Sequence, residues 1–106
     1  MGRAKQAVRL RIYLGEDKKL EDLPLYHGIV MRARRGHIAG ATVLRGTQGF
    51  GRSTRLHTAD VLFSQDLPVI VEMIDTADKM DALVAALSGM KDIGLITWEE
   101  VTIPEW

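Results

Sequence analysis

The order in which strand-like and helix-like patterns follow one another is the feature that most constrains the fold of this chain. Four segments have the alternating or β-branched composition of strands, and two have apolar residues at the spacing of a helix face. The predicted strands cover residues 7–15, 38–46, 67–75 and 94–103. One helix lies between the first two strands and the other between the last two. This β-α-β-β-α-β order predicts an α+β ferredoxin-like sandwich, in which two helices cover one face of a four-stranded antiparallel sheet.

Local signals predict where both helices begin and end. The first is expected to begin at Pro24, because a missing N–H is harmless in a first turn, and to end at Gly36. The second is expected to begin with Thr76 as its N-cap and to end at Gly89. The apolar faces consist of Leu25, Ile29 and Ala33 in the first helix and of Met80, Leu83, Val84 and Leu87 in the second.

Composition places the chain among ordinary globular proteins. It has 106 residues, of which 46% are hydrophobic and 26% charged, so residues 1–106 are expected to form one domain. No apolar run reaches the ~20 residues of a membrane span, and the first ten residues lack a signal-peptide core. The chain has no cysteine, which excludes disulfides and thiolate metal sites. We therefore expect a cytoplasmic protein that is not inserted in a membrane.

The zero net charge conceals an uneven distribution of charged residues. Residues 23–59 contain six arginines and no Asp or Glu, whereas residues 60–106 contain ten acidic residues and two lysines. The planar guanidinium of arginine matches phosphate and carboxylate groups. The basic middle segment therefore indicates an anionic partner. The alternative is that the basic and acidic segments neutralise each other within the fold or between subunits.

The segment GTQGFGRST (46–54) places three glycines within six residues, flanked by arginines and followed by hydroxyl groups. Glycine reaches positive φ at low cost and leaves the backbone open to a ligand, and successive N–H groups can form an anion-binding concavity. The segment therefore predicts an oxyanion site, with a nucleotide phosphate as the first candidate, or else a plain flexible turn. It matches neither the Walker pattern nor the dinucleotide fingerprint.

This segment also carries a resemblance to a known family. The stretch HIAGATVLRGTQGFGRS (37–53) resembles the corresponding segment of the PII signal-transduction proteins, whose Gly-Phe-Gly-Arg turn matches residues 49–52 one for one. Over nearly its whole length the chain most resembles an uncharacterised PII-like family, the domain of unknown function 190. The segments that carry this likeness are LRIYLGE, PLYHGIVMRAR, GATVLRGTQGFG, HTAD and DLPVIVEMID.

The resemblance implies a homotrimer whose sheets line the centre, with an adenine nucleotide bound in clefts between subunits. By position in the matching turn, Gly49, Gly51 and Arg52 would contact phosphate. Weaker candidates are Arg45, Gly46, Gln48, Ser53, Thr54, His57 and, from the turn at 89–94 of a neighbouring subunit, Lys91. The loop would signal to a protein partner, and a membrane transporter is the client that the family suggests.

The sequence also departs from the PII pattern. A Gln-Lys-Gly run follows the matching arginine in PII proteins, but residues 53–55 are Ser-Thr-Arg here, and Val69 replaces the expected lysine. Sensing of 2-oxoglutarate is therefore not expected. No tyrosine lies between residues 52 and 68, which excludes tyrosine nucleotidylation of the loop.

Other functions are less well supported by the residues. No nucleophile has both a base and an orienting third group at suitable spacing, so we expect a non-enzymatic protein that requires no cofactor. Nucleic acid is not an expected partner, because the strands lack the exposed aromatics of an RNA-binding sheet. Asp75, Asp78 and Asp81 are explained by the dipole of the second helix. The alternatives are a divalent-metal-binding trimer resembling the cation-tolerance proteins, a small enzyme acting on a phosphorylated ligand, and a ligand-free interaction module.

Overall fold

The structure is a computed structural model of the chain, and it describes residues 4–51, 57–58 and 67–104. Its main elements, in chain order, are β1 (Lys5–Gly15), α1 (Leu25–Arg35), β4 (Gly40–Arg45), β7 (Pro68–Asp75), α2 (Ala77–Leu87) and β8 (Ile96–Ile103). Two short strand pairs accompany them: β2 (Lys19–Leu20) with β3 (Leu23–Pro24), and β5 (Gln48–Gly49) with β6 (His57–Thr58). The sequence did not predict these short strands.

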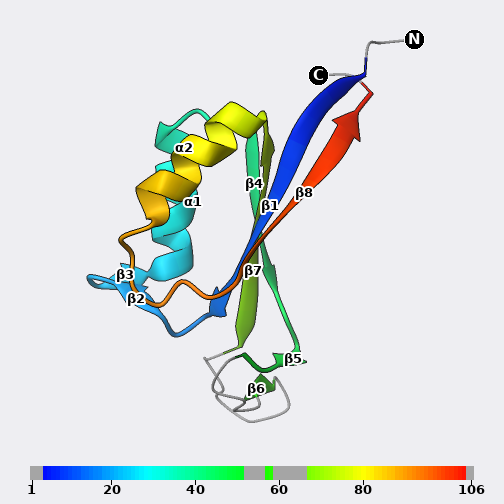
Figure 1. Cartoon of the computed structure of the whole chain (residues 1–106). Coiled ribbons are helices and arrows are strands. Elements are labelled where there is room, and N and C mark those ends of the chain that lie inside the picture. Colours follow the sequence, from blue (N-terminus) through cyan, green and yellow to red (C-terminus); the bar gives the residue numbers. More distant parts are fainter. Residues whose placement is uncertain (1–3, 52–56, 59–66, 105–106) are drawn as a thin grey trace.

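The four long strands form one sheet in the order β4-β7-β1-β8, and every neighbouring pair is antiparallel. Both helices lie on the same side of this sheet (Figure 1). The predicted ferredoxin-like sandwich is therefore confirmed. Neither of the described helices is long and apolar enough to cross a membrane.

The core lies between the sheet and the two helices. Alternate residues of β1 point toward the helices, so that Leu10 and Ile12 are fully buried. The predicted apolar faces of the helices are also buried, apart from Val84, which is partly buried. Ile29 and Met80 are at 0% exposure. The remaining buried members of this core are Val8, Leu14, Leu25, Ala33, Val69, Val71, Met73, Leu83 and Leu87.

The first helix ends as predicted at Gly36, but a different residue takes the left-handed conformation. Gly36 has φ −80°, whereas His37 has φ 59°. The N–H of His37 donates to the carbonyl of Arg34 at 3.1 Å, and the N–H of Ile38 donates to that of Ala33 at 3.0 Å. These two bonds form a Schellman-type ending, which satisfies the last carbonyls of α1.

The second helix begins at its predicted N-cap residue, and its C-cap lies one residue before the predicted Gly89. Thr76 is its N-cap residue, but the Thr76 side chain makes no capping hydrogen bond. The C-cap is Ser88 rather than Gly89, and the Ser88 hydroxyl donates to the carbonyl of Ala85 at 2.8 Å. The Ser88 hydroxyl thus caps one of the last carbonyls of α2, and Gly89 follows directly after the C-cap.

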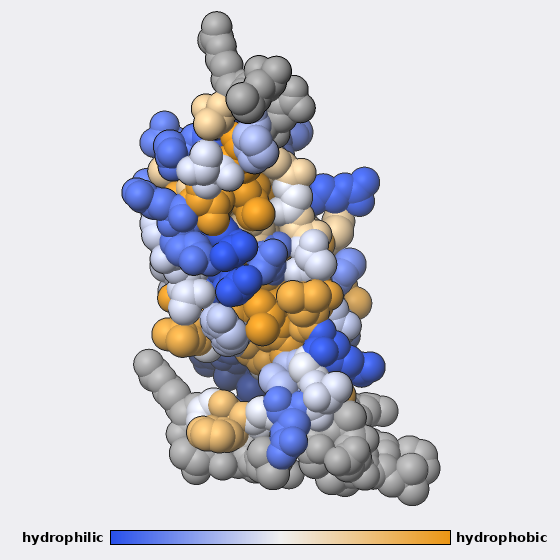
Figure 2. Space-filling model, turned by 90° about the vertical axis from the view of Figure 1, so that its right-hand side faces the viewer, coloured by the Kyte–Doolittle hydropathy of each residue, from blue (hydrophilic) through white to orange (hydrophobic). Residues whose placement is uncertain are grey.

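The face of the sheet opposite the helices is partly apolar and partly charged. Ion pairs Arg9–Glu99 and Arg11–Glu72 cross the strands there, and the hydrogen bond with Glu72 raises the pKa of Arg11 above its ordinary value. Figure 2 shows hydrophilic surface between two hydrophobic areas on this side of the molecule. Each of these four charges has a partner within the same sheet, so burial of this face would leave none of the four unpaired.

Candidate functional site

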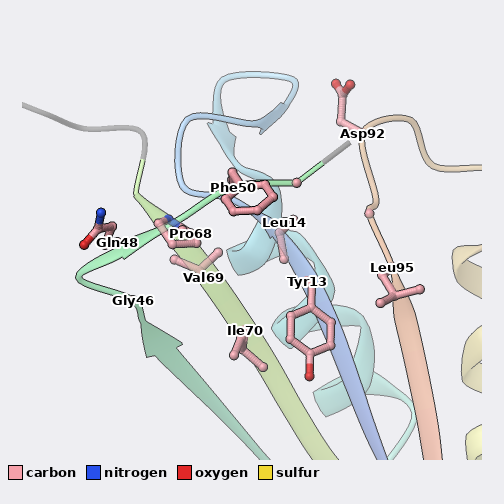
Figure 3. Close-up of a pocket in the computed structure, with 14 residues that line it drawn as sticks. Tyr13, Leu14, Gly46, Gln48, Phe50, Pro68, Val69, Ile70, Asp92 and Leu95 are labelled. Carbon is pink, nitrogen blue, oxygen red and sulfur yellow. The ribbon is translucent and has the colours of Figure 1, made fainter. Parts of the chain in front are cut away.

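A cavity of about 680 Å³ lies at the end of the sheet where β4 ends and β7 begins (Figure 3). Four segments line it: the end of β1, the turn and β5 that follow β4, the start of β7, and the residues just before β8. Antiparallel pairing explains why these segments meet, since the ends of β1 and β4 both lie next to the start of β7. Gly46, Gln48, Gly49 and Gly51 of the predicted site all line this cavity.

A close approach to Pro68 explains the glycine at 46 and leaves little room for a side chain at 49. The N–H of Gly46 donates to the carbonyl of Pro68 at 2.7 Å. A Cβ atom at Gly46 would lie 2.9 Å from the Pro68 Cγ, and one at Gly49 would lie 3.1 Å from it. No glycine in the described ranges has positive φ, so conformational freedom, which the sequence suggested, is not the reason for these two glycines. Gly51 is different, because a Cβ there would meet no atom within 4 Å.

Replacing Gly46 with alanine is therefore expected to disturb the cavity, while the same change at Gly51 is not. The new methyl group must displace the ring of Pro68, which we expect to cost about 1–2 kcal/mol of unfolding free energy, as overpacking does elsewhere. Gly51→Ala should stay within about 0.5 kcal/mol of the parent. Urea unfolding of both variants at one protein concentration measures the difference. Equal stability of the two variants would contradict the close approach.

The short pair β5–β6 brings the two sides of the glycine-rich loop together. Gln48 lies opposite Thr58, and Gly49 lies opposite His57. The backbone of His57 is thus adjacent to the predicted phosphate turn, although 49 and 57 are well separated in sequence. Residues 52–54 (Arg52, Ser53 and Thr54) lie outside the described residues, so their phosphate contacts remain predictions.

Arg45 and Lys91 lie near the cavity without lining it. The guanidinium of Arg45 forms an ion pair with Glu16, whose side chain is only 14% exposed. An anion that binds Arg45 would have to compete with this carboxylate. Lys91 is exposed and precedes Asp92, which does line the cavity. The structure therefore brings the glycines and Gln48 together on the cavity wall, and leaves these two cations outside it.

The described wall is largely apolar, whereas the sequence predicted an oxyanion site. Two of its apolar residues, Phe50 and Leu95, are 70% and 66% exposed. The other apolar lining residues are Tyr13, Leu14, Pro68, Val69 and Ile70. Among the described lining residues Asp92 is the only charged one, and Figure 3 shows its carboxylate directed away from Tyr13. Such a wall suits an aromatic ring better than a phosphate. Phe50, an aromatic between two glycines, was the one sequence signal of this apolar wall.

The described part of the chain offers no ready metal site. In the ranges that the structure describes, no three His, Asp or Glu side chains are grouped so that they could hold an ion. Asp75, the first acid of the group at the start of α2, instead accepts hydrogen bonds from two backbone N–H groups.

The fold is shared with solved structures of PII-like proteins. One solved structure of similar fold is CPII from Thiomonas intermedia K12, a nitrogen regulatory PII-like protein bound to ADP, AMP and bicarbonate. The TM-score is 0.76 at 12% identity, and the match covers 97% of this chain and 92% of that one. Another is a putative PII-like signaling protein from Thermus thermophilus, with a TM-score of 0.70, 12% identity and coverage of 95% and 92%.

Residues 7–103 match the family DUF190, described as "Uncharacterized ACR", and the chain belongs to this family. A UPF0166 protein of Aquifex aeolicus is 35% identical over 95 residues, which cover 89% of this chain and 90% of that protein. A UPF0166 protein of Methanocaldococcus jannaschii is 34% identical over 88 residues, or 82% of each chain. The resemblance drawn from the sequence is thus confirmed.

Proposed function

We propose that this protein is a non-enzymatic PII-like regulator that binds an adenine nucleotide at the cavity beside residues 46–51. The observation that carries this proposal is the cavity itself, which has the glycine turn on its wall. Its volume of about 680 Å³ lies within the range typical of small-molecule sites. Two solved CPII structures that share this fold contain ADP and AMP, and this supports the choice of ligand.

The polarity of the cavity suggests how the nucleotide would lie. The adenine ring would pack against the apolar wall of Tyr13, Phe50 and Leu95. The phosphates would extend toward the arginines of the loop, with Arg52 as the principal contact. The described wall supplies no cation. We therefore propose that the phosphate-binding charge comes from Arg52, from a rearranged Arg45, or from Lys91 of a neighbouring copy.

A regulator of this kind must also transmit to a protein partner whether its ligand is bound. The segments on both sides of the loop line the cavity, at Gly46 and at Pro68, so a bound nucleotide would contact both ends of the loop. A ligand that binds one arrangement of the loop more tightly raises the population of that arrangement. A protein partner would then bind that arrangement selectively. We propose that the protein acts in the cytoplasm as a homotrimer with the partly apolar sheet face at its centre. The client suggested by the family is a membrane transporter.

Nucleotide titration of the purified protein tests this proposal. Light scattering should first give a mass three times the 11.8 kDa of the chain. Calorimetry with ATP, ADP and AMP should then show binding of at least one of them. Arg52→Ala should weaken that binding by about 10- to 150-fold, which corresponds to the loss of one charge-assisted hydrogen bond.

The control for this experiment is Arg34→Ala, because Arg34 lies at the end of α1 and does not line the cavity. Its affinity should equal that of the parent. Absence of binding by all three nucleotides would refute the proposed function. Binding that Arg52→Ala leaves unchanged would remove Arg52 from the site while leaving the nucleotide proposal intact.

A further inference from the structure

A second hollow, of about 330 Å³, lies between the end of α1 and the length of α2. Both helices lie on one side of the sheet, so this hollow is separate from the open sheet face and from the nucleotide cavity (Figure 1). We call it the interhelical groove. The residues that define it are Arg32, Arg35, Ile38, Lys79, Ala82 and Ala86.

The charged residues that line the interhelical groove are all cations. The Nζ of Lys79 donates to the carbonyl of His37 at 2.9 Å and lies 3.7 Å from the Asp75 carboxylate, so its charge is already engaged. Arg32 and Arg35 form no ion pair with any carboxylate in the described ranges of the chain. These two guanidinium groups are therefore available to an anionic partner.

Stabilisation of the helix end does not account for both arginines. Cations in a last turn do favour the helix dipole, and Arg32, Arg34 and Arg35 all lie in the last turn of α1. The final carbonyls of this helix already accept hydrogen bonds from the N–H groups of residues 36–38. Arg34 serves the dipole without lining the groove.

The shape of the groove indicates the kind of partner. Ala82 and Ala86 are exposed and one helical turn apart, and together with Ile38 and the buried Leu83 they give the groove an apolar lining. Arg32 and Arg35 are three residues apart on α1, so their Cβ atoms are about 5–6 Å apart. Acidic residues three or four positions apart on a facing helix have the same spacing.

We propose that the interhelical groove binds an acidic amphipathic helix of a protein partner. Its apolar face would pack on Ala82 and Ala86, and its carboxylates would pair with Arg32 and Arg35. This interaction goes beyond the nucleotide-dependent function and does not depend on it, because it uses neither the nucleotide cavity nor the loop.

A designed peptide tests this proposal with the full-length protein. The probe is a fluorescein-labelled helical peptide of about 15 residues, with leucines on one face and flanking glutamates three or four positions apart. Fluorescence anisotropy at about 0.05 M salt, where screening is weak, measures its affinity. The double variant Arg32→Glu/Arg35→Glu should weaken binding roughly 10-fold or more, since two ion pairs become repulsive. Arg34→Glu is the matched control, and its affinity should stay within about 2-fold of the parent.

Other outcomes would overturn the proposal. Equally tight binding of a peptide with glutamine in place of glutamate would mean that the leucines alone are recognised. Equal weakening by Arg34→Glu would mean general attraction to the basic helix end rather than recognition by the groove. Failure of the probe to bind, together with Arg32/Arg35-dependent binding to phosphatidylserine vesicles, would assign the groove to a membrane surface instead. Circular dichroism melting of each variant verifies that the fold is retained.

Discussion

Replacing Gly94 with alanine is expected to lower the free energy of unfolding by about 2–4 kcal/mol. Gly94 lies just before β8, and a Cβ atom built on it would overlap the carbonyl oxygen of Tyr13 in β1. Backbone atoms cannot move aside as a flexible side chain can. The segment would have to shift away from β1, and the hydrogen bond from the Tyr13 N–H to the carbonyl of Leu95, now 2.9 Å long, would be weakened or lost.

Gly89 is the matched control for Gly94. It lies in the same connection between α2 and β8, and a Cβ atom there would meet no atom within 4 Å. Gly89→Ala should therefore change the unfolding free energy by less than about 0.5 kcal/mol. In a chain of this length, the loss expected for Gly94→Ala corresponds to a drop in Tm of about 10 °C or more, which calorimetry at one protomer concentration would detect. Similar melting of the two variants would show that β8 does not pack against β1 in this way.

Gly94→Ala should also affect the cavity, because Gly94 and Tyr13 both line it. A shift of the segment before β8 would move Leu95 relative to Tyr13. The apolar wall that we assign to the adenine ring depends on these two side chains. The same glycine therefore supports both the sheet and the candidate site.

The main elements could be predicted because they depend on local patterns. Leu25, Ile29 and Ala33 repeat every four residues, and all three are buried as the helix face in the structure. The alternation of residues 7–15 likewise corresponds to the burial pattern of β1. Periodicity of this kind is visible within a few residues, so it requires no knowledge of distant contacts.

The candidate site could be predicted only in part, because its wall depends on distant contacts. The glycine turn was found from local composition. The reason for Gly46 is Pro68, which lies 22 residues further along the chain and meets it only when β4 and β7 pair. Tyr13 and Leu95 line the cavity for the same reason, since they come from opposite ends of the chain. Neither residue carries a sequence signal that points to a ligand.

The sequence correctly placed Asp75 at the start of α2, but it did not indicate the hydrogen bonds that this carboxylate accepts. The sequence placed it with other acids at the start of α2, where the helix dipole favours negative charge. In the structure it is 3% exposed, and its Oδ2 accepts a hydrogen bond from the Ala39 N–H at 2.8 Å. Its Oδ1 accepts one from the Thr76 N–H at 2.6 Å. The carboxylate thus joins the turn after α1 to the start of α2.

Asp75→Ala is expected to lower the unfolding free energy by about 3 kcal/mol, because two backbone N–H groups lose a charged acceptor. Asp75→Asn retains the shape of the side chain and one acceptor oxygen, so it should lose about half as much. Asp78→Asn is the control, since Asp78 is exposed in the first turn of the same helix and should change stability by less than about 0.5 kcal/mol. Urea unfolding of the three variants gives the ranking. If Asp78→Asn cost as much as Asp75→Asn, the helix dipole would explain both acids, and the connection from Asp75 to Ala39 would contribute nothing measurable.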